Sequence, residues 1–238
     1  MVGLLLREDF LSALRKIIFV MLSYIPLGLA CGIALQEAGF TPWMSMVMSL
    51  MAYTGAGQFA AASMVAQGSA AISILITVFF LNLRMSLQTS SLLPYIKHRS
   101  LLFILVFSQV TTDEAYGINI YEFNNNDRWN LSKALIASSL AWLTWSLSVY
   151  FGAYIGSSVE IPTTVVNYVL IAMFISMMVD QLVSRIHAIV ILATIIFTII
   201  FQILLQSSLS IVLATLLASL LGFFIENNSL KKEEGENH

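Results

Sequence analysis

Residues 38–83 read AGFTPWMSMVMSLMAYTGAGQFAAASMVAQGSAAISILITVFFLNL and contain no Asp, Glu, Lys or Arg. A soluble domain would need charged side chains to cover its surface, and this stretch supplies none. Of all 238 residues, 58% are hydrophobic and 10% are charged, whereas about a quarter of the residues of soluble domains are charged. We therefore predict an all-α, polytopic transmembrane helical bundle. The net charge of −2 gives no electrostatic basis for binding nucleic acid.

Eight apolar segments approach the roughly 20 residues that a spanning helix needs. These candidate spans are Ile17–Gln36, Trp43–Ala66, Ala70–Leu93, Leu101–Ile120, Leu131–Gly156, Thr163–Val183, His187–Leu205 and Leu209–Ile225. We expect one transmembrane transport domain, 17–225, between an N-terminal segment, 1–16, and a polar, mobile tail, 226–238. The first apolar stretch has no evident cleavage site, so we interpret it as a helix that stays in the membrane.

Basic residues near the span ends predict the orientation, because cytoplasmic loops carry an excess of Lys and Arg. They occur before the first and fifth spans and after the sixth and the last, at Arg7, Arg15, Lys16, Arg128, Lys133, Arg185, Lys231 and Lys232. This pattern favours eight crossings with both termini in the cytoplasm. Lys97 and Arg99 would then lie outside, against the rule. Seven or fewer crossings, with one of the first four segments re-entrant, is the alternative.

Glycine and proline interrupt two of the spans. The first span carries Pro26 in its middle, with Gly28 and Gly32 one turn apart, and the fifth ends with Gly152 and Gly156. Small residues four apart let helices approach closely, and a mid-helix proline frees backbone groups. We expect a helix break at Pro26, Gly28 and Gly32. The two segments also resemble each other weakly, as in duplicated transporters, although such similarity also arises by chance.

A second candidate break lies in the middle of the second span. Gly55 and Gly57 weaken the helix there, and the amide of Gln58 needs partners in hydrocarbon. A broken helix would present backbone N–H and C=O groups to a ligand, as half-helices do in transporters. The alternative is a tight helix-packing face, which this motif taken alone favours.

Charged residues lie deep in the third and fourth spans. A charge at the bilayer centre costs at least ~2.5 kcal/mol, so Arg84 must face protein or water, next to Asn82. Asp113 and Glu114 could neutralise Arg84, carry a proton or end the helix in an aqueous pocket. A structural ion pair, or carboxylates that are merely interfacial, are the alternatives. Polar residues recur along the third span at helical spacing: Arg84, Gln88, Ser91 and Tyr95, beside Asn82, Ser86, Thr89 and Ser90.

Other polar positions have simpler interpretations. Asp180 and Gln181 lie near Arg185 and suggest a surface ion pair. Cys31 lies in an apolar run and is expected to be a small core residue. We expect no cofactor and no metal, because the three histidines are scattered and no nucleotide-binding, zincin or hydrolase motif is present.

The segments described above occur together, and in the same order, in a known family. Their set resembles proteins of the AzlC family, the large subunit of branched-chain amino acid exporters. It comprises Ser23–Pro26 with Gly28 and Gly32, Tyr53–Phe59, Asn82–Arg84, Pro94, Thr112–Glu114, Trp142, Trp145, Gly152, Gly156 and Met173–Ser176. Each motif is weak by itself, but the ordered set is fairly specific and covers most of the chain.

The resemblance implies a multi-pass permease of the bacterial cytoplasmic membrane that exports small amino acids, driven by the proton gradient. It implies a small AzlD-like membrane subunit as partner, and a homo-oligomer is compatible with it. Gly55, Gly57, Gln58, Asn82 and Arg84 would then bind substrate. Asp113 and Glu114 would couple transport to protons. A membrane assembly subunit, an uncharacterised channel and a membrane enzyme are the rival classes.

Overall fold

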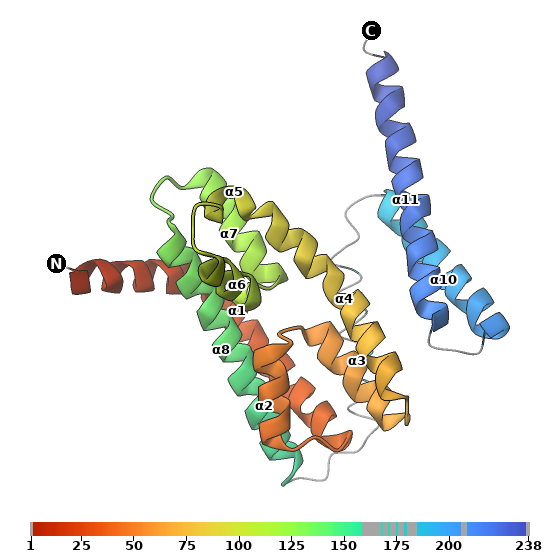
Figure 1. Ribbon diagram of the computed structural model, residues 1–238, viewed down its shortest axis with the longest axis horizontal. Coiled ribbons are helices and arrows are strands. Elements are labelled where there is room, and N and C mark those ends of the chain that lie inside the picture. Colours follow the sequence, from red (N-terminus) through yellow and green to blue (C-terminus); the bar gives the residue numbers. More distant parts are fainter. Residues whose placement is uncertain are drawn as a thin grey trace. The chain divides into compact units, whose positions relative to one another are not determined.

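The computed structural model describes residues 2–158, 185–205 and 209–236, together with residues 168, 171, 175 and 179. It divides into two compact units, Met1–Val169 and Leu170–His238. The first unit contains α1 (Val2–Glu37), α2 (Pro42–Met51), α3 (Gly55–Ala66), α4 (Ala71–Ser91), α5 (Leu93–Ile96), α6 (Leu101–Val110), α7 (Asp113–Asn125) and α8 (Leu131–Gly156). The second contains α10 (Arg185–Leu205) and α11 (Leu209–Glu236) (Figure 1). The predicted all-α membrane fold is confirmed, with no strand among the described residues.

Helices α1 and α8 form the centre of the first unit and run parallel to each other. At their beginnings, Lys133 of α8 lies 3.6 Å from the carboxylate of Asp9 in α1. At their ends, Gly156 of α8 lies against Gln36 of α1. Two parallel spans start on the same side of a membrane, so the chain between them crosses the membrane an odd number of times.

Glycines allow these two helices to touch backbone to backbone. A β-carbon built on Gly32 would lie 2.1 Å from the carbonyl oxygen of Val149. One built on Gly152 would lie 2.2 Å from the carbonyl oxygen of Leu29. The close approach predicted from the spacing of Gly28, Gly32, Gly152 and Gly156 is therefore present, between the two segments that carry the motif.

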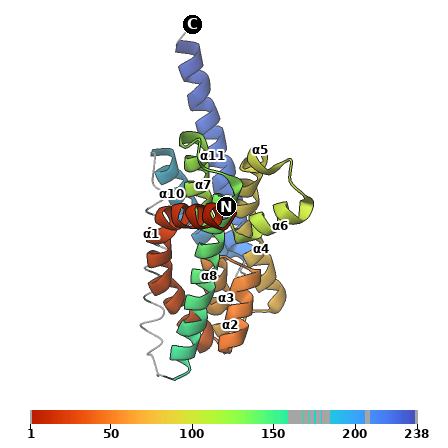
Figure 2. The same ribbon diagram turned by 90° about the vertical axis from the view of Figure 1, so that its left-hand side faces the viewer.

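The helix break expected at Pro26, Gly28 and Gly32 is absent, because α1 is helical from Val2 to Glu37 with Pro26 inside it. A proline removes one backbone hydrogen bond and bends a helix without having to end it. Figure 2 shows that α1 changes direction along its length but continues. Gly28 is used for packing instead, against Ser148.

The second predicted span is a hairpin of two short helices rather than one crossing. Helix α2 runs antiparallel to α8, since Trp43 packs on Tyr150 and the carbonyl of Leu50 accepts from Trp142 Nε1 at 3.3 Å. Residues 52–54 are not helical, and α3 then leads away beside α4. The hairpin therefore leaves on the side from which it entered, as Figure 1 shows. Thr54 begins α3 by accepting a hydrogen bond from the Gly57 N–H at 3.3 Å.

The fourth predicted span is likewise broken. Helices α6 and α7 meet at Thr111 and Thr112 with a bend of 118°. Helix α7 then runs alongside α4: Tyr116 accepts from Ser91, and farther on Asn124 accepts from Tyr95 at 2.8 Å. This second hairpin enters and leaves at the end where α4 finishes and α8 begins, opposite to the first hairpin (Figure 1).

The two reversals change the expected topology. By length and composition, the described residues contain four helices able to cross a membrane, or five if α6 and α7 count as one span. In the first unit we assign the crossings to α1, α4 and α8. Lys97–Arg99 then lie at the same end as Arg128 and Lys133, so the alternative with re-entrant segments accounts for the basic residues better than eight crossings. At this end Glu122 of α7, which is buried, bonds Lys16 of α1 at 2.7 Å.

In the second unit, helices α10 and α11 form an antiparallel pair. Gln202 of α10 accepts a hydrogen bond from Ser210 of α11, and Gly222 packs against Val190. Helix α11 continues to Glu236, so residues 226–236 of the tail expected to be mobile are helical. Most of the predicted span Thr163–Val183, including Asp180 and Gln181, lies outside the described residues.

Candidate functional site

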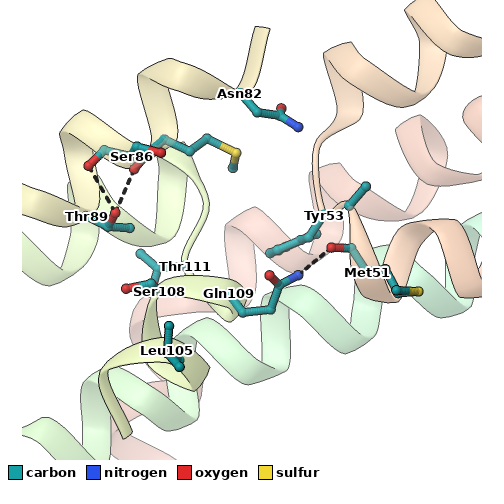
Figure 3. A pocket seen from close by; sticks show the side chains of 11 residues that line it. Met51, Tyr53, Asn82, Ser86, Thr89, Leu105, Ser108, Gln109 and Thr111 are labelled. Carbon is teal, nitrogen blue, oxygen red and sulfur yellow. Dashed lines mark hydrogen bonds between the residues drawn. The ribbon is translucent and has the colours of Figure 1, made fainter. Parts of the chain in front are cut away.

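A cavity of about 300 Å³ lies where the tips of the two hairpins face the middle of α4. The first tip contributes residues 51–53, and the second contributes the end of α6 with Thr111. Helix α4 supplies one polar face, as Figure 3 shows. The lining residues are Met51, Ala52, Tyr53, Asn82, Met85, Ser86, Thr89, Leu105, Ser108, Gln109 and Thr111. The cavity thus lies where two helix breaks bring backbone groups that have no partner within their own helix close to α4.

The two tips are tied to each other and to α8. Gln109 of α6 donates its side-chain amide to the carbonyl oxygen of Met51 at 2.8 Å, and more weakly to that of Leu50 at 3.3 Å (Figure 3). Trp142 of α8 also donates to Leu50. The last carbonyls of α2 have no helical partner, so these side chains satisfy groups that hydrocarbon could not.

The polar face of α4 agrees with the stripe predicted from the sequence. Asn82, Ser86 and Thr89 all line the cavity. Thr89 turns its hydroxyl back to the carbonyl oxygen of Met85 at 2.9 Å, so its hydrogen-bonding capacity is partly used within the helix. Among the described residues, Oδ1 of Asn82 and the hydroxyl of Tyr53 are buried without a hydrogen-bond partner.

Gln58 does not face the cavity. It is fully buried in α3, where its amide nitrogen donates to Ser49 at 2.6 Å and its amide oxygen accepts from Trp145 at 2.7 Å. Gln58 therefore joins α2, α3 and α8 and fixes the shape of the first hairpin. Gly55 and Gly57 support the same shape. Side-chain atoms of Trp145 lie 3.1 Å from a β-carbon built on Gly55, and those of Thr54 lie 2.7 Å from one built on Gly57.

Arg84 forms the ion pair expected with the fourth segment. Its guanidinium lies 2.7 Å from Oδ2 of Asp113, the first residue of α7. The Arg84 side chain is 40% exposed in the isolated chain and that of Asp113 is 26% exposed, and neither lines the cavity. Oδ1 of Asp113 is buried without a hydrogen bond among the described residues. The pair links α4 to the tip of the second hairpin. Arg84 follows Asn82 by only two residues, so the two side chains leave α4 on different sides.

Glu114 hydrogen-bonds to α1, whereas its neighbour Asp113 pairs with Arg84 of α4. The carboxylate of Glu114 accepts a hydrogen bond of 2.5 Å from the hydroxyl of Tyr24, which also lies 2.9 Å from the hydroxyl of Thr112. Tyr24 is buried in α1 and packs edge-on against Trp145, with ring centroids 5.3 Å apart. The two adjacent carboxylates therefore contact different helices, Asp113 through α4 and Glu114 through α1.

Sequence reasoning missed Tyr24, Tyr53 and Gln109 as parts of this site. Tyr24 and Tyr53 each lie two residues before a predicted helix break, at Pro26 and at Gly55. An aromatic residue in an apolar segment does not by itself indicate a functional site. Only the packing of α1, α3 and α7 around the tips shows where these hydroxyls lie. In the described residues, no group of three His, Cys, Asp or Glu side chains converges as a metal site would require.

Comparison with known proteins places the chain in a sequence family. A family model described as AzlC protein matches residues 20–159, which include both hairpins and all of α8. The chain is 29% identical over 154 residues to the inner membrane protein YgaZ of Escherichia coli K12, covering 63% of this chain and 62% of YgaZ. It is 25% identical over 170 residues to an uncharacterized membrane protein of Helicobacter pylori J99, covering 68% and 72%. No solved structure matches.

Proposed function

The chain belongs to the AzlC family of membrane proteins, and we propose that it is the large subunit of a permease that exports branched-chain or similar small amino acids. Family membership gives the general class, a transporter-type membrane protein. The matched residues contain every part of the cavity, so the family's defining region and the candidate site coincide. The direction of transport, the substrate and coupling to protons belong to the proposal.

One observation carries the proposal: two re-entrant hairpins enter from opposite ends, and their tips meet at one polar cavity. Each tip closes the cavity toward one side, so movement of one hairpin would open it to that side only. Alternating access around a fixed midplane site works in this way, with broken helices supplying the site. A channel would need both sides to be open at once, and the Gln109 contacts to α2 oppose that.

The charged groups beside the cavity are suited to coupling. We assign this role to Asp113 and Glu114, whose partners Arg84 and Tyr24 lie on two different helices. Protonation of either carboxylate would weaken its link to one helix and loosen the second hairpin. Asn82 then contributes to substrate binding from within the cavity. Gly55, Gly57 and Gln58 shape the first tip, and Arg84 holds the second.

We further propose that the permease lies in the bacterial inner membrane with both termini in the cytoplasm. It would act with a small AzlD-like membrane subunit. The end of the first unit that carries Lys16, Lys97 and Arg128 would be cytoplasmic. The relative named YgaZ is an inner membrane protein, which supports this location.

Efflux from a defined membrane tests the function. Proteoliposomes containing the chain and its partner should release preloaded radiolabelled leucine faster than empty liposomes, and a pH gradient should change the rate. Arginine and glutamate serve as control solutes. Equal release of all three would indicate a leak or channel. No release in either orientation, from protein that is folded and bound to its partner, would favour an assembly subunit.

A further inference from the structure

Helix α7 is held in the first unit by polar contacts on two sides. Toward the α1–α8 pair, Asn119 donates to the hydroxyl of Ser138 in α8 at 3.0 Å. Glu122 bonds Lys16 of α1 at 2.7 Å. Toward α4 and α5, the helix makes the two hydrogen bonds already described. Helix α7 therefore fills the space between α4 and the α1–α8 pair, from the cavity, which Thr111 lines, to the end that carries Lys16 (Figure 1).

The residues that α7 buries are small or polar. They are Ala115, Asn119 and Glu122, which lie on one face of the helix at spacings of four and three residues. Movement of α7 away from this position exposes little apolar surface, and water can replace the hydrogen bonds that the polar groups lose. The other arms of the hairpins differ, because α3 completely buries Phe59 and α6 completely buries Phe107.

Glu122 attaches the far end of α7 to α1. Its side chain is 4% exposed, and its carboxylate is bonded by Lys16 and by Asn126, each at 2.7 Å. The Lys16 side chain is 47% exposed, so its ammonium group already reaches water at this end of the molecule. If the pair separates, both charges can be hydrated there, and neither is left unpaired in hydrocarbon.

We propose that α7 is the gate between the cavity and the side on which Lys16 lies, and that the Lys16–Glu122 pair is the latch that holds this gate closed. Opening pivots α7 about residues 111–112, which are not helical, so its far end leaves α1 while its tip stays near Arg84. Helix α6 and the first hairpin keep their places. This inference rests on the proposed function and deepens it, because it names the helix that moves and the contact that controls it.

Access to the cavity from each side tests the latch. The full chain, with its co-expressed partner and in a Cys31→Ala background, carries Ser86→Cys in the cavity as the reporter. A membrane-impermeant maleimide is added to right-side-out or inside-out membrane vesicles, and a separate His98→Cys variant identifies which vesicles present the Lys16 side. Glu122→Gln should raise the initial labelling rate of the reporter from that side about threefold or more, the effect of losing a partly exposed ion pair. Labelling from the opposite side should not rise.

Asp9→Asn is the matched control. It removes the ion pair with Lys133, which lies at the same end but joins α1 to α8 rather than to α7. Its reporter should be labelled at the parent's rate. Lys16→Gln removes the other half of the latch and should act like Glu122→Gln. The double variant should be labelled no faster than the faster single variant, because both changes remove the same contact.

Side-specific labelling decides between a latch and a purely structural contact. No rise from the Lys16 side in either single variant would overturn the inference. An equal rise from both sides, or an equal rise in Asp9→Asn, would also overturn it by showing general loosening of the protein. The labelling does not depend on leucine. A rise confined to the Lys16 side, in a protein that releases no leucine, would therefore support the gate and contradict the proposed function. Unchanged labelling in a protein that exports leucine would overturn this inference alone.

Discussion

At the scale of single residues, the ion pair between Arg84 and Asp113 holds the second hairpin tip on α4. Removing one partner leaves the other as an unpaired charge near the membrane centre, which costs more than losing the pair. We expect Arg84→Ala to abolish leucine efflux and to lower the amount of folded protein. Asp113→Asn should flatten the dependence of efflux on pH. Size-exclusion profiles and efflux rates at several pH values measure both effects.

The double variant Arg84→Gln with Asp113→Asn separates folding from transport. It removes both charges, so it should restore the yield of folded protein better than it restores efflux. Lys97→Gln, which changes an exposed charge beyond α4, is the control and should leave both unchanged. Normal efflux from Arg84→Ala would show that the pair is dispensable.

Gln58 makes a second prediction at this scale. Gln58→Leu would leave the buried Ser49 hydroxyl and the Trp145 indole N–H each without its side-chain partner. An unsatisfied buried group costs about 1–3 kcal/mol, so we expect a clear fall in melting temperature. Gln67→Leu, which loses only an exposed contact with Ser63, is the control. Equal melting temperatures for the two variants would contradict a structural role of Gln58.

At the scale of helices, close packing of α1 on α8 depends on glycine. A β-carbon on Gly32 would meet backbone atoms of α8 within 2.5 Å, and backbone cannot move aside as a side-chain tip can. Gly32→Ala should therefore separate the helices and destabilise the protein by about 1–3 kcal/mol. In α7, Gly117 has nothing within 4 Å of its added β-carbon, so Gly117→Ala should be neutral or slightly stabilising. Thermal unfolding in detergent compares the two.

Helices also show how far the sequence could predict the fold. Hydropathy located nearly every helical segment, and the spacing of Gly28 and Gly32 predicted close packing. Hydropathy could not tell a crossing from a hairpin, because α2 with α3 is as apolar as a continuous span. The reversal depends on Thr54 capping α3 and on Gln109 satisfying the end of α2, which are contacts between distant segments. The same limit applies to the site, where Asn82 was predicted and Tyr53 was not.

At the scale of the whole molecule, the hairpins predict a specific membrane topology. With the N-terminus in the cytoplasm, α1 and the first hairpin put Gln67 outside, and α4 returns His98 to the inside. In a Cys31→Ala background, a membrane-impermeant thiol reagent should label Gln67→Cys and Ser158→Cys in intact cells. His98→Cys and Ser229→Cys should react only after permeabilisation. Eight crossings would instead expose His98→Cys and protect Gln67→Cys, and the reverse labelling of Ser158 and Ser229 would invert the orientation.

The exposed side of α4 leads to the last prediction. No residue of α4 is buried, and Leu75, Phe79 and Leu87 are more than half exposed in the isolated chain. Lipid can cover such a face, but it cannot hold α4 in register with the two hairpin tips, whereas a packed membrane helix can. We therefore expect co-expression with an AzlD-like subunit to raise the yield and melting temperature of the chain and to be required for leucine efflux. Co-expression with an unrelated membrane protein of similar size is the control. Full efflux from the chain alone would refute the two-subunit proposal, and an increase in yield without efflux would limit the partner to assembly.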